Sequence, residues 1–210
     1  MRKKLIIVGA GGLGRIVHDV FFKDPNLNEE IELAGFLDTR ADLVLPQDMN
    51  CPLLGSPRTY PIRRDEIFIP AIGDPKLRKN LVSPLEDQGA EFYSYKNGAF
   101  ISARFKIGCG SFVTPGSVIS VDCQFGNFNF IDTYCVIGHD VKIGDHCMIG
   151  AMTFIAGGVR IGNEVAIHPR ATIAKAVEIG DGATIGIGSV VVKNVPAGVT
   201  VFGNPARVIY

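Results

Sequence analysis

The stretch IDTYCVIGHDVKIGDHCMIG, residues 131–150, places isoleucine at every sixth position, beginning at Ile131. Extending this count gives sixteen consecutive large apolar residues, from Ile101 to Val191, without a single insertion; thirteen of them are isoleucine. An α-helix would repeat near 3.6 residues and an ordinary strand at 2, so neither element explains the period. A chain that turns a corner every six residues does explain it.

The residues around each sixth position support the same interpretation. Glycine follows in eight of the sixteen cases, and a small or β-branched residue usually stands four places after, as at Ser111, Ser117, Cys123, Cys135, Val141, Cys147 and Thr153. We expect the large residue to point inward, glycine to permit the corner, and the small residue to fill the remaining interior. Three such sides close a coil of 18 residues, which predicts a parallel β-helix roughly 25 Å tall at about 4.8 Å per coil. The cysteines are then packing residues.

The N-terminal part alternates strands and helices. The sequence predicts strands at residues 5–8, 31–37, 66–72 and 91–95, and helices at residues 15–22 and 75–88. This β-α-β-β-α-β order is Rossmann-like, with about half the content of a dinucleotide-binding fold, so a single nucleotide is the more economical ligand.

A glycine-rich loop follows the first of these strands. Residues 9–14 fit the pattern GxGxxG, and Asp38 comes 24 residues after Gly14 at the end of a strand. Gly11 and Gly12 would let backbone amides approach a phosphate at the start of a helix, and Asp38 would contact a ribose or a base. Gly73, at a neighbouring strand end, could admit the same ligand. The alternative is a purely structural tight turn.

Composition excludes some classes of partner. The formal net charge is zero and the pI about 6.9, so nothing favours nucleic acid or an anionic membrane. Residues 1–97 hold 27 of the 42 charged side chains, and the other 113 residues hold 15, so we expect faces of the repeat to be buried against other chains. The apolar run at residues 5–8 is too short for a signal peptide or membrane span. Five cysteines without a CxxC pair favour a reduced, cytoplasmic setting.

Five segments, in this order, carry a family resemblance: residues 9–14 (GAGGLG), 36–38 (FLD), 71–78 (AIGDPKLR), 137–144 (IGHDVKIG) and 203–206 (GNPA). The whole chain resembles the bacterial sialic-acid O-acetyltransferase and nucleotide-amino-sugar N-acetyltransferase family. The resemblance implies a left-handed β-helix at residues 98–210, behind a nucleotide-sugar-binding domain at residues 1–97. It also implies a homotrimer with active sites between neighbouring prisms and acetyl-CoA along the prism groove, with no metal.

The resemblance also implies which residues act. The family's catalytic His and the acidic residue after it fall on His139 and Asp140, and its acetyl-CoA backbone contacts fall near Pro169 and Ile187. Its nucleotide-sugar contacts fall on Gly11, Gly12, Leu13, Asp38, Thr39 and Gly73.

Three positions depart from the family pattern. Leu13 stands where the family often has His, and Asp132 replaces a common Asn in the acceptor pocket. Met148 stands where a second His would touch the thioester carbonyl, and a thioether cannot donate that hydrogen bond. His146, two residues earlier, is a doubtful substitute because it falls on a different side of the strand.

The chemistry expected of these residues is direct acetyl transfer. An imidazole titrates near neutrality and can take a proton from a sugar amine or hydroxyl. Asp140 would fix the ring tautomer of His139, although neighbours on a strand point oppositely, so the chain must bend there. The oxyanion donor is expected to be a backbone N–H, with Gly150 and Gly157 as possible sites. His18 is expected to be a surface or packing residue, and His168 to be structural or interfacial.

The predicted function is therefore acetyl-CoA-dependent N-acetylation of a nucleotide-linked amino-deoxysugar. The nearest alternative is O-acetylation of a sialic-acid-like sugar by the same base. A prism-shaped carbonic anhydrase with zinc between subunits is a rival enzyme, but the spacing of His139, His146 and His168 does not match it. A nucleotide-binding trimeric scaffold without catalysis is the rival of another class.

Overall fold

A computed structural model describes residues 2–25, 27 and 31–210. The chain divides into two compact units after Tyr93, four residues before the expected boundary at residue 97. The difference arises because residues after Tyr93 already bond to the β-helix. Ser94 Oγ donates to the carbonyl of Gly108 (2.8 Å), and Tyr95 forms a parallel bridge with Phe112. Tyr95 was expected to belong to the preceding strand, which instead ends at Phe92.

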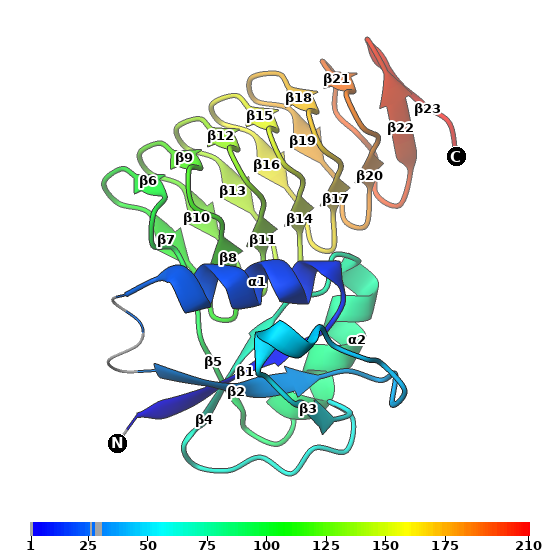
Figure 1. Cartoon of the computed structure of the whole chain (residues 1–210). Helices are drawn as coiled ribbons and strands as arrows, with labels where there is room; N and C mark the ends of the chain where they lie inside the picture. Colours follow the sequence, from blue (N-terminus) through cyan, green and yellow to red (C-terminus); the bar gives the residue numbers. More distant parts are fainter. Residues whose placement is uncertain (1, 26, 28–30) are drawn as a thin grey trace. The chain divides into compact units, whose positions relative to one another are not determined.

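The first unit is a parallel five-stranded sheet with two α-helices. Its strands lie in the order β3-β2-β1-β4-β5, and every pairing is parallel. The elements are β1 (Lys3–Val8), α1 (Gly12–Lys23), β2 (Ile31–Leu37), the 3-10 helix η1 (Gln47–Met49), β3 (Leu53–Gly55), β4 (Glu66–Pro70), α2 (Pro75–Glu86) and β5 (Glu91–Phe92) (Figure 1). In the described part of the chain, no helix combines the length and the apolar character that a membrane crossing requires.

The sequence-based expectation missed β3. This strand has only three residues and pairs beyond β2, where Phe36 N donates to the carbonyl of Pro52 (2.9 Å) and Asp38 N donates to the carbonyl of Gly55 (2.9 Å). Such a short edge strand has no period of its own to detect. It matters for function because the bond to Gly55 fixes the backbone of Asp38 at the end of β2.

The second unit is a three-sided left-handed parallel β-helix. Strands recur at 18-residue offsets from β6 to β21, and β22 stacks on β20 after an offset of 16 residues (Figure 1). We call its faces sheet I (β6, β9, β12, β15, β18, β21), sheet II (β7, β10, β13, β16, β19) and sheet III (β8, β11, β14, β17, β20, β22, β23).

The chain passes from sheet I to II to III and back, and almost every strand has two residues. The bounds are β6 Phe100–Ile101, β7 Lys106–Ile107, β8 Phe112–Val113, β9 Val118–Ile119, β10 Gln124–Phe125, β11 Phe130–Ile131, β12 Val136–Ile137, β13 Lys142–Ile143, β14 Met148–Ile149, β15 Phe154–Ile155, β16 Arg160–Ile161, β17 Ala166–Ile167, β18 Thr172–Ile173, β19 Glu178–Ile179, β20 Thr184–Ile185, β21 Val190–Val191, β22 Thr200–Gly203 and β23 Ala206–Val208.

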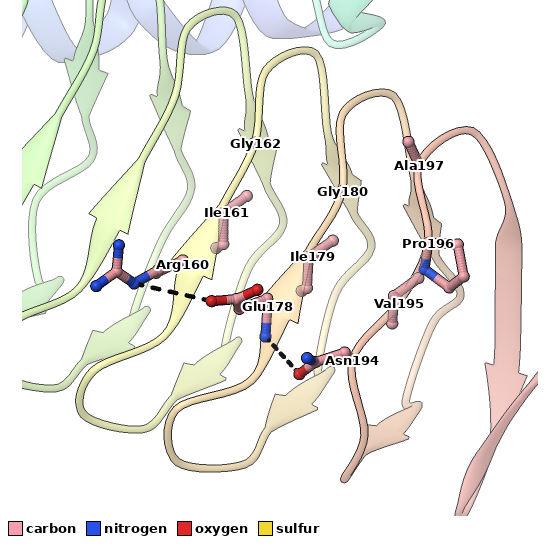
Figure 2. Close-up of a pocket in the computed structure, with 10 residues that line it drawn as sticks. All are labelled: Arg160, Ile161, Gly162, Glu178, Ile179, Gly180, Asn194, Val195, Pro196 and Ala197. Atoms are coloured by element: carbon pink, nitrogen blue, oxygen red, sulfur yellow. Dashed lines mark hydrogen bonds and ion pairs between the residues drawn. The ribbon is translucent and has the colours of Figure 1, made fainter.

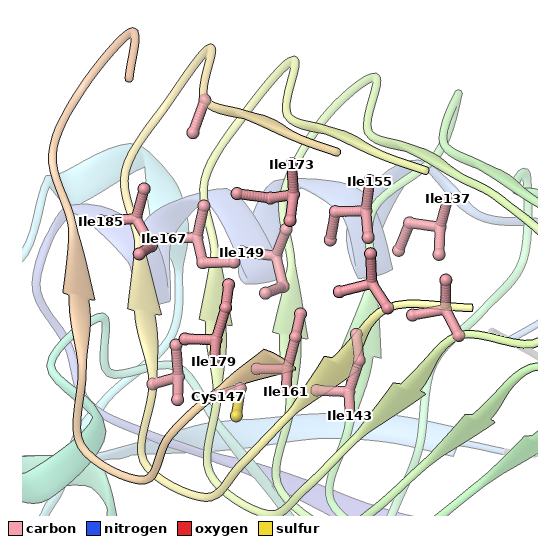
Figure 3. Close-up of a cluster of buried hydrophobic side chains, with 14 of the residues drawn as sticks. Ile137, Ile143, Cys147, Ile149, Ile155, Ile161, Ile167, Ile173, Ile179 and Ile185 are labelled. Carbon is pink, nitrogen blue, oxygen red and sulfur yellow. The ribbon is translucent and has the colours of Figure 1, made fainter. Parts of the chain in front are cut away.

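The interior is filled as the six-residue period predicts. The second residue of each two-residue strand points inward, and those from Val113 to Val191 are buried, while Ile101 and Ile107 at the first coil are only partly covered. Isoleucines from the three sheets meet in rows, with Cys147 between them (Figure 3). The predicted small residues from Ser111 to Thr153 are also buried, which confirms their role as fillers.

The expected role of glycine at the corners is wrong. The left-handed backbone falls three places after the inward residue and is mostly not glycine, as at Asp140 (φ 60°) and His146 (φ 57°). Glycine directly after the inward residue is needed for a different reason: the next coil lies so close that a Cβ at this position would collide with it. A Cβ on Gly138 would stand 2.6 Å from the nitrogen of Gly157, which is shorter than real contacts allow.

A ladder of side-chain amides and carboxylates runs along the corner between sheets II and III. Each Oδ1 accepts the backbone N–H of the equivalent residue one coil earlier. The four bonds measure 2.7 to 3.0 Å and are accepted by Asn127, Asp145, Asn163 and Asp181. The ladder thus satisfies corner N–H groups that point along the axis, beyond the reach of the sheets.

Candidate active site

A cavity of about 430 Å³ lies at the carboxyl ends of β1 and β4. The chain leaves these two neighbouring strands toward opposite edges of the sheet, which is where open parallel sheets bind ligands. The residues expected to bind the nucleotide sugar gather there. The lining includes Gly11, Gly12, Leu13, Asp38, Thr39 and Gly73.

The glycines of the loop have two different roles. Gly9 has φ 105°, and a Cβ there would stand 2.8 Å from the carbonyl oxygen of Ala71, while one on Gly14 would collide with the carbonyl of Gly9. These two glycines let the loop and α1 pack closely. Gly11 and Gly12, by contrast, meet no backbone atom within 4 Å, so they present bare main chain to the cavity. Gly11 caps α1 without any side-chain bond, which leaves the first N–H groups of the helix for a ligand.

Asp38 is held by its own neighbours. Its Oδ2 accepts from Ala10 N (2.9 Å), and the guanidinium of Arg40 donates to both carboxylate oxygens (2.8 and 2.9 Å). The hydrogen bonds from Arg40, followed by that from Ala10, lower the pKa of Asp38 to about 2 despite its burial. The sequence analysis missed Arg40, although a cation two residues after an acidic strand end was a visible signal.

The second site lies at the corner between sheets I and II. His139 and Asp140 follow β12, and His139 Nδ1 is 2.7 Å from Asp140 Oδ2. The left-handed backbone at Asp140 supplies the bend that lets adjacent side chains meet. Because the carboxylate can only accept, it selects the tautomer with hydrogen on Nδ1 and leaves Nε2 as the basic nitrogen. Both side chains are more than half exposed, so a substrate can reach them.

The imidazole lies against Gly157 on the next coil. A Cβ at that residue would stand 2.5 Å from His139 Nε2 and 2.7 Å from Cε1. The ring can therefore occupy this position only because residue 157 is glycine. Gly150, the other oxyanion candidate, lies at the corner between sheets III and I and already donates its N–H to the carbonyl of Ile167 (2.7 Å). Of the two glycines considered as oxyanion donors, only Gly157 therefore lies beside His139.

Other expected residues lie elsewhere on the prism. Asp132, Pro169 and the exposed Ile187 follow sheet III strands, so all three occupy the corner between sheets III and I. Within one chain, the width of sheet I therefore separates them from His139. Met148 lies on the outer side of β14 in sheet III itself.

The remaining histidines do not join His139. His146 is buried at the corner between sheets II and III, where its ring stacks on Phe128 with centroids 4.8 Å apart, so it is a packing residue. His168 is at the third corner, and His18 packs between Phe22 and Phe36 in the first unit. Within the described residues, no three His, Cys, Asp or Glu side chains are grouped as a metal would need.

The interior cysteines are unsuited to nucleophilic roles. Burial raises the pKa of the Cys135 thiol to about 12 and also raises that of Cys123. Both sulfurs lie within hydrogen-bonding range of a carbonyl, that of Gly150 for Cys135 and that of Gly138 for Cys123. A thiol held in this state is not available as thiolate, in line with the packing role expected for them.

A further cavity, about 490 Å³ and open, lies on sheet II near the end of the prism. Figure 2 shows its polar edge, where Arg160 Nε lies 4.0 Å from Glu178 Oε1 and Glu178 N donates to Asn194 Oδ1 (2.9 Å). It contains none of the residues expected to act, and it begins at Arg160, which pairs with Lys142 one coil earlier.

Two protein families match the two parts of the chain. Residues 4–85 match the PglD N-terminal domain, and residues 122–157 match the bacterial transferase hexapeptide family of six repeats. In both parts the chain resembles the hexapeptide-repeat sugar acetyltransferases, as expected. It is an acyltransferase, and the fold class expected from the six-residue period is confirmed. No curated protein matches the sequence.

Solved structures resemble this sugar acetyltransferase over its whole length. PerB of Caulobacter crescentus, solved with CoA and GDP-perosamine, is 28% identical, with 99% of this chain and 97% of that chain covered and a TM-score of 0.85. WeeI of Acinetobacter baumannii AYE is 27% identical, with 99% and 100% covered and a TM-score of 0.72. The acetyltransferase domain of PglB from Neisseria gonorrhoeae FA1090 shares the fold at 24% identity, with 99% and 100% covered and a TM-score of 0.89.

Proposed function

We propose that this acetyltransferase moves the acetyl group of acetyl-CoA to the amino group of a nucleotide-linked amino-deoxysugar, with His139 as general base. The observation that carries the proposal is the pair formed by His139 and Asp140, in which Nδ1 of His139 is bonded to Asp140 Oδ2 and the imidazole is more than half exposed. Support for the acceptor comes from PerB, described as a perosamine N-acetyltransferase and solved with GDP-perosamine and CoA.

The reaction needs one base and one donor. The amine lone pair attacks the thioester carbonyl, a C–N bond forms, and the C–S bond then breaks to release CoA. His139 Nε2 takes the proton that the amine loses and can return it to the leaving sulfur. Asp140 stays ionised and stabilises the imidazolium that forms in between. This scheme requires no covalent intermediate, in agreement with the unreactive interior cysteines.

The developing oxyanion needs a hydrogen-bond donor close to the base. Gly157 meets that requirement because its backbone lies against Nε2 of His139, whereas the N–H of Gly150 is already used. Its lack of a side chain also leaves room for a thioester beside the ring. We therefore assign the oxyanion contact to the backbone of Gly157.

A cyclic assembly of chains would complete the site. Asp132, Pro169 and Ile187 lie at one edge of sheet I and His139 at the other, so the edges can meet only between neighbouring copies. The outer side of sheet I is apolar and exposed, with Phe100, Val118, Val136 and Phe154 each more than a third accessible, whereas sheet II carries mainly charged residues. Three copies packed through sheet I would bury this surface and place an active site at each boundary.

Release of CoA from acetyl-CoA in the presence of amino-sugar nucleotides tests the activity. His139→Ala should lower kcat/KM by about 100- to 10,000-fold, the usual contribution of a general base, with the assembly unchanged. Lys106→Ala is the control, because this exposed residue lies on the outer side of sheet II, away from both edges of sheet I. A His139→Ala enzyme with near wild-type kcat/KM would exclude the mechanism. If the wild type releases no CoA with any amino-sugar nucleotide, the alternatives of O-acetylation or a non-catalytic scaffold gain support.

A further inference from the structure

Three charged residues occupy equivalent places on successive coils at the corner between sheets I and II. We call Arg104, Asp122 and Asp140 the corner row, because each follows the inward residue of a sheet I strand by three places. All three have left-handed backbone, with φ of 61°, 62° and 60°. Hydrogen bonds join their coils, from Asp122 N to the carbonyl of Ala103 (3.2 Å) and from Asp140 N to that of Val121 (3.1 Å). The three side chains therefore leave the corner in similar directions, about 4.8 Å apart at their base.

The first two members of the corner row form an ion pair. The guanidinium of Arg104 donates from Nε to Asp122 Oδ1 and from Nη2 to Asp122 Oδ2 (2.7 Å), so the contact is bidentate and fixes both groups. The hydrogen bond from Arg104 lowers the pKa of Asp122, and the hydrogen bond to Asp122 raises that of Arg104. The two side chains are 65% and 38% exposed, so the pair adds little to folding stability.

The third member, Asp140, is the carboxylate bonded to His139. The pKa of Arg104 is raised first by Asp122 and then also by the charge of Asp140. The pKa of the Cys123 thiol is raised chiefly by burial and further by both carboxylates. Asp122 and Asp140 are therefore close enough to interact. Without Arg104 they would be unpaired like charges on adjacent coils, and the second charge would favour the imidazolium, which cannot act as a base.

Other charged groups around the base are exposed to water. Sheet I presents apolar side chains beside the base, and the next coil has Gly157 and Gly158 at this corner. In the described part of the chain, the other cations on this side are Lys106, Lys142 and Arg160 on the outer side of sheet II and Lys175 two coils beyond His139. The next copy in the proposed trimer would add Asp132, His168 and Arg170. Arg104 differs from these groups because its guanidinium is fixed on a carboxylate of the corner row.

We propose that Arg104 is a positioning residue of the active site, which holds Asp122 in a closed pair so that Asp140 alone acts on the imidazole of His139. The inference rests on the proposed function, in which His139 is the base. Arg104 acts through its neighbours, not by contact with substrate. Its removal changes the formal charge of the corner row from minus one to minus two. The imidazolium then becomes more stable, and the titration midpoint of the His139 ring moves to higher pH.

NMR titration of the histidine rings in the full chain tests this without turnover. The chain has four histidines, and the His139 signal is assigned by its loss in His139→Ala. At low ionic strength, Arg104→Gln should raise the midpoint by about 0.3 to 0.5 pH unit, the effect of one charge about 7 Å away in water. Asp122→Asn should lower it by a similar amount, and the double variant should return to the wild type. Arg104→Lys, which keeps the charge, should lie between Arg104→Gln and the wild type.

The matched control is Lys106→Gln, which removes an exposed cation two residues farther along the chain. Its midpoint should stay within about 0.1 pH unit of the wild type, because water screens an unpaired surface charge. An unchanged midpoint in Arg104→Gln would overturn the proposal, and so would an equal shift in Lys106→Gln.

The pH dependence of CoA release adds a second readout. The acidic limb of kcat/KM for Arg104→Gln should move to higher pH by the same amount, a loss of about two- to threefold on that limb, with an unchanged alkaline plateau. A merely structural role would lower kcat/KM equally at every pH, which would also overturn the proposal. Failure of the proposed function looks different: turnover would survive His139→Ala, or the wild type would release no CoA. A midpoint shift would then remain, and Arg104 would not belong to an active site.

Discussion

Adding one methyl group at Gly157 should disable the base without replacing His139 itself. In the structure, a Cβ at this residue would stand 2.5 Å from Nε2 of His139, whereas ordinary contacts begin at about 3.4 Å. The ring in Gly157→Ala must therefore move by the difference, about 0.9 Å, or rotate out of its bond with Asp140. A misplacement of about 1 Å at a reacting group can cost on the order of 100-fold in rate. We expect kcat/KM to fall by about that factor.

The fold should tolerate the change. Equivalent corner positions one coil earlier and one coil later hold His139 and Lys175, so a side chain fits this backbone. The imidazole that must yield is 55% exposed, so moving it costs little stability. The melting temperature should stay within about 2 °C of the wild type, which corresponds to less than about 1 kcal/mol for a chain of this size.

A double-mutant cycle separates the ring from other effects. Steady-state CoA release is measured for the wild type, Gly157→Ala, His139→Ala and the double variant. If the methyl group acts through the imidazole, Gly157→Ala should have little further effect once His139 is alanine. A loss of the same size in both backgrounds would show that Gly157 acts independently of the ring. Wild-type kcat/KM in Gly157→Ala would refute the position assigned to the base.

Two further predictions concern charge and assembly. Because Arg40 lowers the pKa of Asp38 to about 2, the ion pair should stabilise the protein above about pH 4 and lose this contribution as the pH falls through 2. The free energy of urea unfolding for Arg40→Gln should thus lie below that of the wild type at pH 7, and this gap should narrow in acid; a gap independent of pH would contradict the assignment. Phe154→Asp should place a charge on the apolar outer side of sheet I. Light scattering should then give the mass of one chain instead of that of the trimer proposed for the wild type, with Lys142→Asp on sheet II as the control; a wild-type mass of one chain would exclude the trimer.

The six-residue period predicted most of the second unit because the interior of a β-helix admits little else. One large residue and one small residue fill each side of a coil, so the position of a residue in the six-residue repeat predicts its burial, as at Ile137 and Cys147. The role of glycine was misassigned because the sequence does not show how close successive coils lie. At Gly138 the constraint is an atom of Gly157, nineteen residues away.

The candidate sites were predictable to different degrees. The contact between His139 and Asp140 follows from adjacency once a corner is placed there, and the glycine loop follows from its pattern between a strand and a helix. The position of the Arg40 side chain could not be predicted because it depends on the hydrogen bonds that this side chain donates to the buried carboxylate of Asp38. The distance of Pro169 from His139 could not be foreseen either, since it depends on which corner each position occupies.

The ladder at the corner between sheets II and III alternates in charge. Going along the axis, the acceptors are Asn127, Asp145, Asn163 and Asp181, so an amide separates every carboxylate from the next. Coils repeat at about 4.8 Å, a spacing at which stacked carboxylates would repel each other. Asn163 therefore acts as an electrical spacer as well as an acceptor. Asn163→Asp would keep the bond accepted from Asp145 N but lose the bond that Nδ2 donates to Asp181 Oδ1 (3.4 Å), and it would line up three like charges, giving a prism that is less stable at neutral pH than in acid.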